Sequence, residues 1–205
     1  MSRLLLVRHG LTDYNTARRF LGQTDIELSE SGYRQAEKLR DYLAGEGVDV
    51  AYSSDLRRAL STAEVICLDR GLDVVPCPEL RECDYGECEG LTFGEIGSRY
   101  PEVARRCVNF TLELEFPEGE CFTDLFERTS RFLGTLDRHG PGEAVLVVAH
   151  DGPLKALVCL LLGIDGGHWW QLQLDTASLS IVETSPRGAR LARLNDTSHL
   201  VGDGS

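Results

Sequence analysis

The sequence LLLVRHGLTDYN, residues 4–15, decides the fold of this chain. Residues 4–7 are all apolar, which is typical of a short strand buried on both faces in the middle of a mainly parallel sheet. In open α/β sheets, ligands bind where the chain leaves the carboxyl end of a strand. We therefore expect Arg8 and His9 at a ligand site, although these residues alone are equally compatible with a core histidine beside a surface arginine.

A second strand of the same kind favours the ligand site. Residues 144–149 (AVLVVA) are again apolar, and His150, Asp151 and Gly152 follow them directly. If the two strands are neighbours in the sheet, their carboxyl ends bring both imidazoles to one pocket. A histidine beside an arginine and a glycine supplies a nucleophile or proton carrier, an anion clamp and room for close approach of the backbone.

Further motifs follow in order along the chain: Arg8-His9-Gly10-x-Thr12-x-x-Asn15, Ser54-Asp55-Leu56-Arg57-Arg58-Ala59, Leu80-Arg81-Glu82, Tyr85-Gly86, Glu89-Gly90 and His150-x-Gly152. Together they resemble the histidine phosphatase superfamily, also called phosphoglycerate-mutase-like, over nearly the whole chain. The resemblance implies an α/β fold, a three-layer sandwich in which a mostly parallel central sheet carries helices on both faces. It also implies a single domain over residues 1–205, with residues 91–121 or so as a variable cap over the site.

The same resemblance assigns roles to individual residues. It implies that His9 attacks phosphorus, that Glu82 carries a proton and that His150 donates to developing charge. It gives the phosphate contacts to Arg8, Arg58, Asn15 and Gln23, leaves Arg57 on the rim and makes Arg81 a further candidate. Crowding by Asp84, Glu87 and Glu89 is expected to raise the pKa of Glu82.

Local patterns predict the remaining elements. A helix is expected from about residue 28 to 43, with Ala36, Leu39 and Leu43 on one face. Strands are expected at 48–52 and 73–76, and Ser53-Ser54 is expected to cap the helix that carries Arg58. A long amphipathic helix should follow Phe122, and residues 178–183 and 189–194 should form an antiparallel hairpin. The tail residue His199 is expected at the surface.

The composition excludes several classes of protein. The chain has 205 residues, of which 42% are hydrophobic, and a formal net charge of −12. That size suffices for one sizeable core, and the acidic balance disfavours binding to nucleic acid or to an anionic membrane. We expect a cytoplasmic protein, because the first apolar run is too short for a signal peptide and no run is long enough to span a bilayer. The sequence leaves open whether it is a monomer or a homodimer.

The seven cysteines are an odd number and contain no Cys-x-x-Cys pair, so a disulfide framework is not expected. A zinc site at Cys83 and Cys88 with Cys107 or Cys121 is a minor alternative, because the spacing fits no standard ligand pattern. No metal or other cofactor is expected, since two arginines and a histidine already supply positive charge.

These expectations describe a metal-independent phosphomonoesterase that acts on a small phosphorylated metabolite through a phosphohistidine intermediate. The short length and the Leu-Arg-Glu stretch look most like an α-ribazole phosphatase, which implies α-ribazole 5′-phosphate as a candidate substrate. A phosphoglycerate mutase-type phosphotransferase is the nearest alternative. A catalytically inactive module that binds a phosphorylated ligand is the second.

Overall fold

The computed structural model describes residues 2–108 and 111–201. Its centre is a six-stranded sheet in the order β3-β2-β4-β1-β5-β6. The strands are β1 (Ser2–Arg8), β2 (Val50–Ser53), β3 (Val74–Pro76), β4 (Ala144–Ala149), β5 (Leu179–Ser185) and β6 (Gly188–Asp196). The first four pair in parallel, whereas β5 runs antiparallel to β1 and β6 antiparallel to β5. The last two strands form the predicted hairpin.

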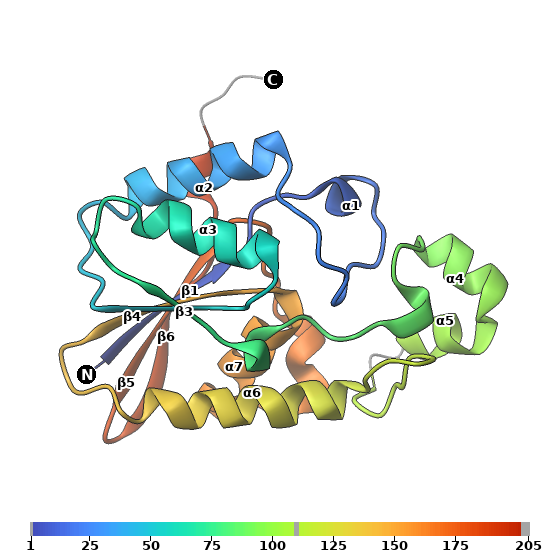
Figure 1. Ribbon diagram of the computed structural model, residues 1–205. Helices are drawn as coiled ribbons and strands as arrows, with labels where there is room; N and C mark the ends of the chain where they lie inside the picture. Colours follow the sequence, from blue (N-terminus) through green and yellow to red (C-terminus); the bar gives the residue numbers. More distant parts are fainter. Residues whose placement is uncertain (1, 109–110, 202–205) are drawn as a thin grey trace.

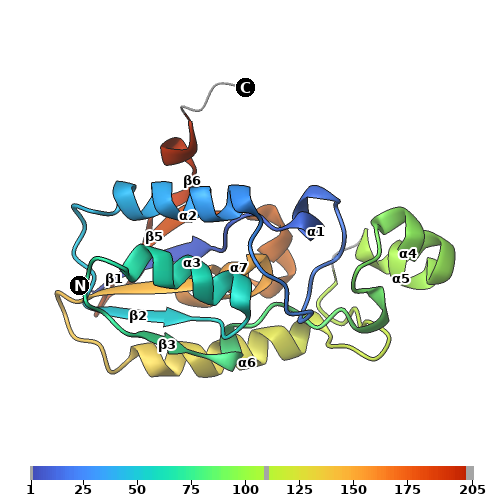
Figure 2. The same cartoon turned by 45° about the horizontal axis from the view of Figure 1, so that its top comes forward.

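Helices cover both faces of this sheet (Figure 1). Helices α2 (Glu30–Tyr42) and α3 (Arg57–Cys67) pack on one face, and α6 (Phe122–Leu136) and α7 (Asp151–Leu162) lie on the other, as the turned view also shows (Figure 2). Successive side chains of β1 alternate between the faces: Leu4 and Leu6 join one core cluster, while Leu5 and Val7 join the other. The prediction of a three-layer α/β sandwich with a mostly parallel sheet is confirmed.

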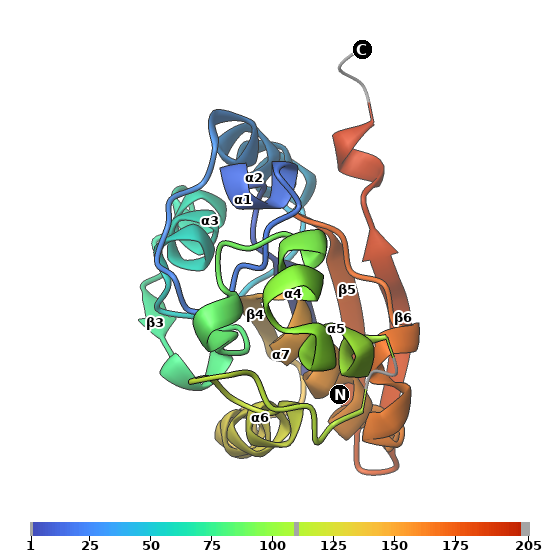
Figure 3. The ribbon, with the colours of Figure 1, turned by 90° about the vertical axis from the view of Figure 1, so that its right-hand side faces the viewer.

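A third apolar cluster lies beyond the carboxyl ends of the parallel strands. It includes Ile96, Phe116, Phe122 and Trp169. The short helices α4 (Phe93–Arg99) and α5 (Pro101–Cys107) belong to this region and stand in front of the sheet when it is viewed from that end (Figure 3). Helix α1 (Asp13–Thr16) and the short 3₁₀ helices η1 (Pro78–Leu80), η2 (Gly86–Cys88), η3 (Gly166–Gln171) and η4 (Ser198–Leu200) complete the elements. A single domain with residues 91–121 as its cap stays a prediction; residues 109 and 110 lie outside the described residues.

Two local expectations, at Ser53-Ser54 and at His199, are wrong, and the structure does not support the minor zinc alternative. Ser53-Ser54 does not cap α3, because Leu56 occupies the N-cap position and no side chain caps the helix; Ser54 Oγ instead accepts from the Leu56 N–H. The cysteines of the alternative zinc site do not come together, since among the described residues no three histidine, cysteine or carboxylate side chains are grouped to bind a metal ion. His199 is half-buried rather than at the surface, stacked on Tyr42 and hydrogen-bonded to the Ala177 carbonyl. All seven cysteines are free thiols.

No helix in the described part of the chain is both long and apolar enough to cross a membrane.

Candidate active site

The register of β1 against β4 brings the two motif histidines together. Arg8 pairs with Ala149 across the sheet, and the His9 N–H donates to the Ala149 carbonyl at 3.0 Å. The segments that follow β1 and β4 therefore leave the sheet side by side, and the ring centroids of His9 and His150 lie 5.0 Å apart. Both residues are buried, with 3% and 0% of their surface exposed. The two copies of the strand-histidine pattern thus meet in one site.

His9 is held in the form that a nucleophile needs. Its Nδ1 lies 2.7 Å from the Gly10 carbonyl oxygen, which can only accept, so Nδ1 carries the proton and Nε2 presents its lone pair. Burial, reinforced by the guanidinium groups of Arg58 and Arg8, holds the pKa of His9 well below its ordinary value. The ring is therefore neutral at neutral pH.

Arg58, in the first turn of α3, is the largest fully buried side chain in the core. Its Nε donates to His150 Nδ1 at 3.2 Å, and its two amino groups donate to the carbonyls of Thr24 and Gly22 at 2.9 and 2.5 Å. Burial lowers its pKa to about 10, so the guanidinium still carries its charge at neutral pH. Arg58 thereby ties the loop after α1 to the second histidine.

His150 has partners on both ring nitrogens. Because the Arg58 Nε–H can only donate, Nδ1 of His150 accepts, and its Nε2–H donates to Ser54 Oγ at 2.9 Å. Burial first, and then the charge of Arg58, hold the pKa of His150 well below its ordinary value. In this tautomer, the neutral ring of His150 can donate its Nε2–H to an anion only if the anion replaces Ser54 Oγ as the acceptor.

Arg8 points its guanidinium toward the same region. One amino group donates to the Leu174 carbonyl at 2.5 Å and lies 3.6 Å from the Asp151 carboxylate. Its buried Nε has no hydrogen-bond partner among the described residues. A buried donor without an acceptor is unfavourable, and an anionic ligand would supply an acceptor for this Nε–H.

Glu82 is 5% exposed and reaches the amino end of α7. Its carboxylate accepts from the Cys83 N–H at 2.9 Å and from the Gly152 N–H at 3.2 Å. Burial, followed by the charge of Asp151, raises the pKa of Glu82 above its ordinary value even though these N–H bonds oppose the shift. The predicted direction is right, but the cause is burial and Asp151 rather than crowding by Asp84, Glu87 and Glu89.

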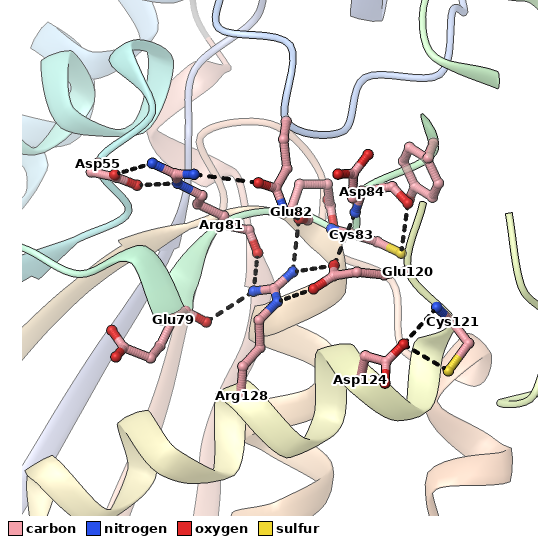
Figure 4. Close-up of polar contacts among 12 residues, drawn as sticks. Asp55, Glu79, Arg81, Glu82, Cys83, Asp84, Glu120, Cys121, Asp124 and Arg128 are labelled. Atoms are coloured by element: carbon pink, nitrogen blue, oxygen red, sulfur yellow. Dashed lines mark hydrogen bonds and ion pairs between the residues drawn. The ribbon is translucent and has the colours of Figure 1, made fainter. Parts of the chain in front are cut away.

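Arg128 of α6 fixes the backbone that carries Glu82 (Figure 4). The side chain is almost fully buried and donates to the carbonyls of Glu79, Arg81 and Glu82, while it also pairs with both carboxylate oxygens of Glu120. Glu120 in turn accepts from the Asp84 N–H at 3.0 Å. Arg128 and its partner Glu120 together hold the chain on both sides of Glu82 and join it to the segment just before α6.

The other predicted residues lie around this centre. The Asn15 side-chain oxygen accepts from the N–H and the hydroxyl of Thr12 and closes the capping box of α1, which leaves its NH₂ group as a donor. Gln23 donates to the Glu82 carbonyl at 3.4 Å and accepts from Arg81. Arg81 forms a bidentate pair with Asp55, and exposed Arg57 pairs with Asp25 and Glu27. The catalytic and phosphate-binding roles of all these residues stay predictions.

Sequence reasoning missed Ser54, Asp151 and Arg128 as parts of the site. Ser54 and Asp151 lie inside motifs in which roles were assigned only to other residues, Arg58 and His150. Arg128 had a signal of its own, because it falls between Leu125 and Phe132 on the apolar stripe of α6, where a charged residue needs a buried partner. That partner, Glu120, lies just before the N-cap of α6, so the helical periodicity of the sequence does not reveal it.

Comparison with known proteins identifies the family of this chain. The model of the histidine phosphatase superfamily (branch 1) matches residues 4–197, so the chain belongs to this family. It is 36% identical to phosphoserine phosphatase 1 of Hydrogenobacter thermophilus, over 98% of this chain and 95% of that protein. It is 41% identical to a bifunctional protein of Mycobacterium tuberculosis over 97% of this chain, but it spans only 55% of that relative.

A solved structure gives the same result for the fold. The α-ribazole phosphatase of Shigella flexneri superposes with a TM-score of 0.89 at 28% identity, over 99% of this chain and 100% of that one. The protein is accordingly a phosphatase of the histidine phosphatase superfamily. The relatives carry the names of different substrates, so they do not define the ester that this protein hydrolyses.

Gly152→Ala is expected to lower phosphatase activity by displacing Glu82. A Cβ at position 152 would overlap the Glu82 carboxylate and would lie 2.9 Å from Leu125. Because a misplacement of about 1 Å can lower a rate by about 10²-fold, we expect a loss in kcat of that order. Gly134→Ala, in a helix with nothing within 4 Å of the added methyl group, is the matched control and should leave activity intact. Equal activity of the two variants would contradict the placement of Glu82.

Arg128→Lys is expected to lower kcat by about tenfold, because one ammonium group cannot reach three carbonyls and a carboxylate at once. KM should change little, since Arg128 contacts the Glu82 backbone rather than the two histidines. Arg131→Lys, at an exposed position one turn further along α6, is the control. Steady-state kinetics on a purified, folded variant measure both constants, and an unchanged kcat would remove Arg128 from the positioning of Glu82.

Proposed function

We propose that this phosphatase is a metal-independent phosphomonoesterase that hydrolyses a small phosphorylated metabolite through a phosphohistidine at His9. One observation carries the proposal: the hydrogen bond from His9 Nδ1 to the Gly10 carbonyl leaves the Nε2 lone pair available in a buried site beside two guanidinium groups. Phosphoryl transfer depends chiefly on positioning and on stabilisation of charge on the equatorial oxygens. The described residues offer both.

In the first step, His9 Nε2 forms a bond to phosphorus while the bond to the leaving oxygen breaks in line with it. Arg8 and Arg58 neutralise the phosphate oxygens, and the unpartnered Nε of Arg8 is one donor for them. His150 contributes its Nε2–H once the phosphate replaces Ser54. The NH₂ groups of Asn15 and Gln23 are further donors that the proposal assigns to the phosphate.

Glu82 handles the proton in both steps. A protonated carboxyl gives its proton to the departing alkoxide, and the resulting carboxylate then takes one from the water that attacks phosphorus. That attack breaks the N–P bond and releases inorganic phosphate and neutral His9. The raised pKa of Glu82 supports this role, because it keeps the carboxyl protonated to a higher pH than a surface glutamate.

We propose α-ribazole 5′-phosphate as a candidate substrate. The similarity to the α-ribazole phosphatase of Shigella flexneri supports it, together with the Leu80-Arg81-Glu82 stretch. Transfer of the phosphoryl group from His9 to a second sugar acid, rather than to water, is the alternative outcome that a phosphoglycerate mutase assay detects.

His9→Ala should abolish hydrolysis of p-nitrophenyl phosphate, because it removes the atom that bonds to phosphorus. His168→Ala, at an exposed position in η3, is the matched histidine control and should retain full activity. Rapid base quenching during turnover should trap phosphate on His9, and mass spectrometry locates it. EDTA should leave the activity of the wild-type protein unchanged; strong inhibition by the chelator or failure to trap the intermediate would overturn the proposal.

The pH profile should follow the two shifted groups. His9 must be neutral and its pKa lies below 6.5, so the acidic limb of kcat/KM should fall below that pH. Glu82 must be protonated and its pKa lies above 4.5, so activity on alkyl phosphates should decline as the pH rises through that raised value. Glu82→Gln should lose more activity on ethyl phosphate than on p-nitrophenyl phosphate, whose leaving group needs no proton. An equal loss on both esters would exclude Glu82 as the proton donor.

A further inference from the structure

A cavity of about 300 Å³ lies beside the proposed phosphate site, and its walls are mainly aromatic. Asp151 forms its polar end; this residue directly follows His150 and faces Arg8 at 3.6 Å. The aromatic side chains that line the cavity come from five separate segments of the chain: Phe20, Tyr85, Phe116, Phe122, Trp169 and Trp170. A group attached to the phosphate through a short link would enter this space.

The aromatic wall is continuous and preformed. Ring centroids of Tyr85 and Phe116 lie 4.9 Å apart, those of Phe116 and Phe122 lie 5.7 Å apart, and those of Phe122 and Trp169 lie 4.6 Å apart. Such edge-to-face and tilted contacts hold rings in fixed orientations. The wall therefore does not need to rearrange before it accepts another flat group.

The charges at the cavity are already paired with each other. Lys155 donates to the Asp151 carboxylate at 2.7 Å and lies 5.6 Å from the centre of the Trp169 ring. These are the charged residues among those that line the cavity in the described part of the chain. A substrate that carries its own carboxylate or ammonium group would have to compete with this ion pair, whereas an uncharged ring would not.

Trp169 adds an observation of a different kind. It is 5% exposed, and its indole N–H has no hydrogen-bond partner among the described residues. A buried donor in this state is unfavourable, so a wall that includes it is better suited to a ligand than to a closed apolar core.

From these contacts we infer that the protein prefers phosphomonoesters of alcohols that carry a flat, uncharged ring close to the phosphate, and that this cavity binds the ring. The inference rests on the proposed phosphomonoesterase activity and names the class of leaving group. At about 300 Å³ the cavity is at the small end of ligand pockets, so one or two fused rings fill it. Phosphorylated amino acids and sugar acids are disfavoured, because their charged groups would have to compete with the ion pair between Asp151 and Lys155.

The test compares benzyl phosphate with ethyl phosphate and phosphoserine on the full-length protein. Benzyl and ethyl phosphate both release an alkoxide of a primary alcohol, so a difference between them reports on binding of the ring rather than on the leaving group. We expect kcat/KM for benzyl phosphate to exceed both other values by about tenfold or more. Equal values for benzyl and ethyl phosphate, or a preference for phosphoserine, would overturn the inference.

Substitutions in the wall assign the preference to this cavity. Phe122→Leu and, at the exposed rim, Trp170→Ala should each lower the ratio of kcat/KM for benzyl to ethyl phosphate by severalfold. Phe93→Ala removes an exposed aromatic side chain of α4 and should leave that ratio unchanged. An unchanged ratio in both wall variants would place the ring elsewhere.

The two proposals fail in different ways. If the wild-type protein turns over none of the three esters and not p-nitrophenyl phosphate either, the proposed phosphomonoesterase activity itself is wrong. If it hydrolyses p-nitrophenyl and ethyl phosphate without favouring benzyl phosphate, only the inference about the ring is wrong.

Discussion

The parallel pairing of β1 with β4 is the constraint on which the site depends. Because Arg8 stands opposite Ala149, the residues that follow each strand emerge at the same height, and two imidazoles meet 5.0 Å apart. A slip of one residue would turn every side chain of β1 to the opposite face of the sheet. It would move Leu4 and Leu6 out of one core cluster and separate the histidines in the same event. The apolar packing of β1 and the geometry of the site are therefore fixed by the same register.

Burial then gives each group of the site its chemical character. The same removal from water lowers the pKa values of His9 and His150 and raises that of Glu82, so it favours the neutral form of all three groups. Arg58 keeps its charge, because its pKa stays at about 10 and its three nitrogens donate to His150 and to the carbonyls of Thr24 and Gly22. A cationic site with neutral histidines suits a phosphate dianion, although the chain as a whole is strongly acidic.

The sequence predicted the parts of this arrangement that follow from local pattern. Apolar runs ending in histidine were visible at residues 4–9 and 144–150, and the class of fold followed from them together with the family motifs. The partners of these residues were not visible, because they depend on the meeting of distant segments. Ser54 contacts His150 across 96 positions, and Arg128 reaches the Glu82 carbonyl across 46. The aromatic cavity was the least readable feature, since the residues that line it are spread from Phe20 to Trp170 and share no period.

The groups proposed for catalysis also oppose one another in the stability of the fold. A histidine whose pKa is lowered on folding binds more protons in the unfolded chain, so the contributions of His9 and His150 to stability decline as the pH falls below 6.5. A glutamate whose pKa is raised on folding has the reverse effect, and the contribution of Glu82 declines as the pH rises through its folded value. The site cannot escape either effect, because exposure to water would restore the ordinary pKa values and with them an imidazole that is partly charged near neutral pH and a charged carboxylate. The hydrogen bonds of Arg128 to the carbonyls of Glu79 and Glu82 hold this segment in the buried position on which the raised pKa of Glu82 depends.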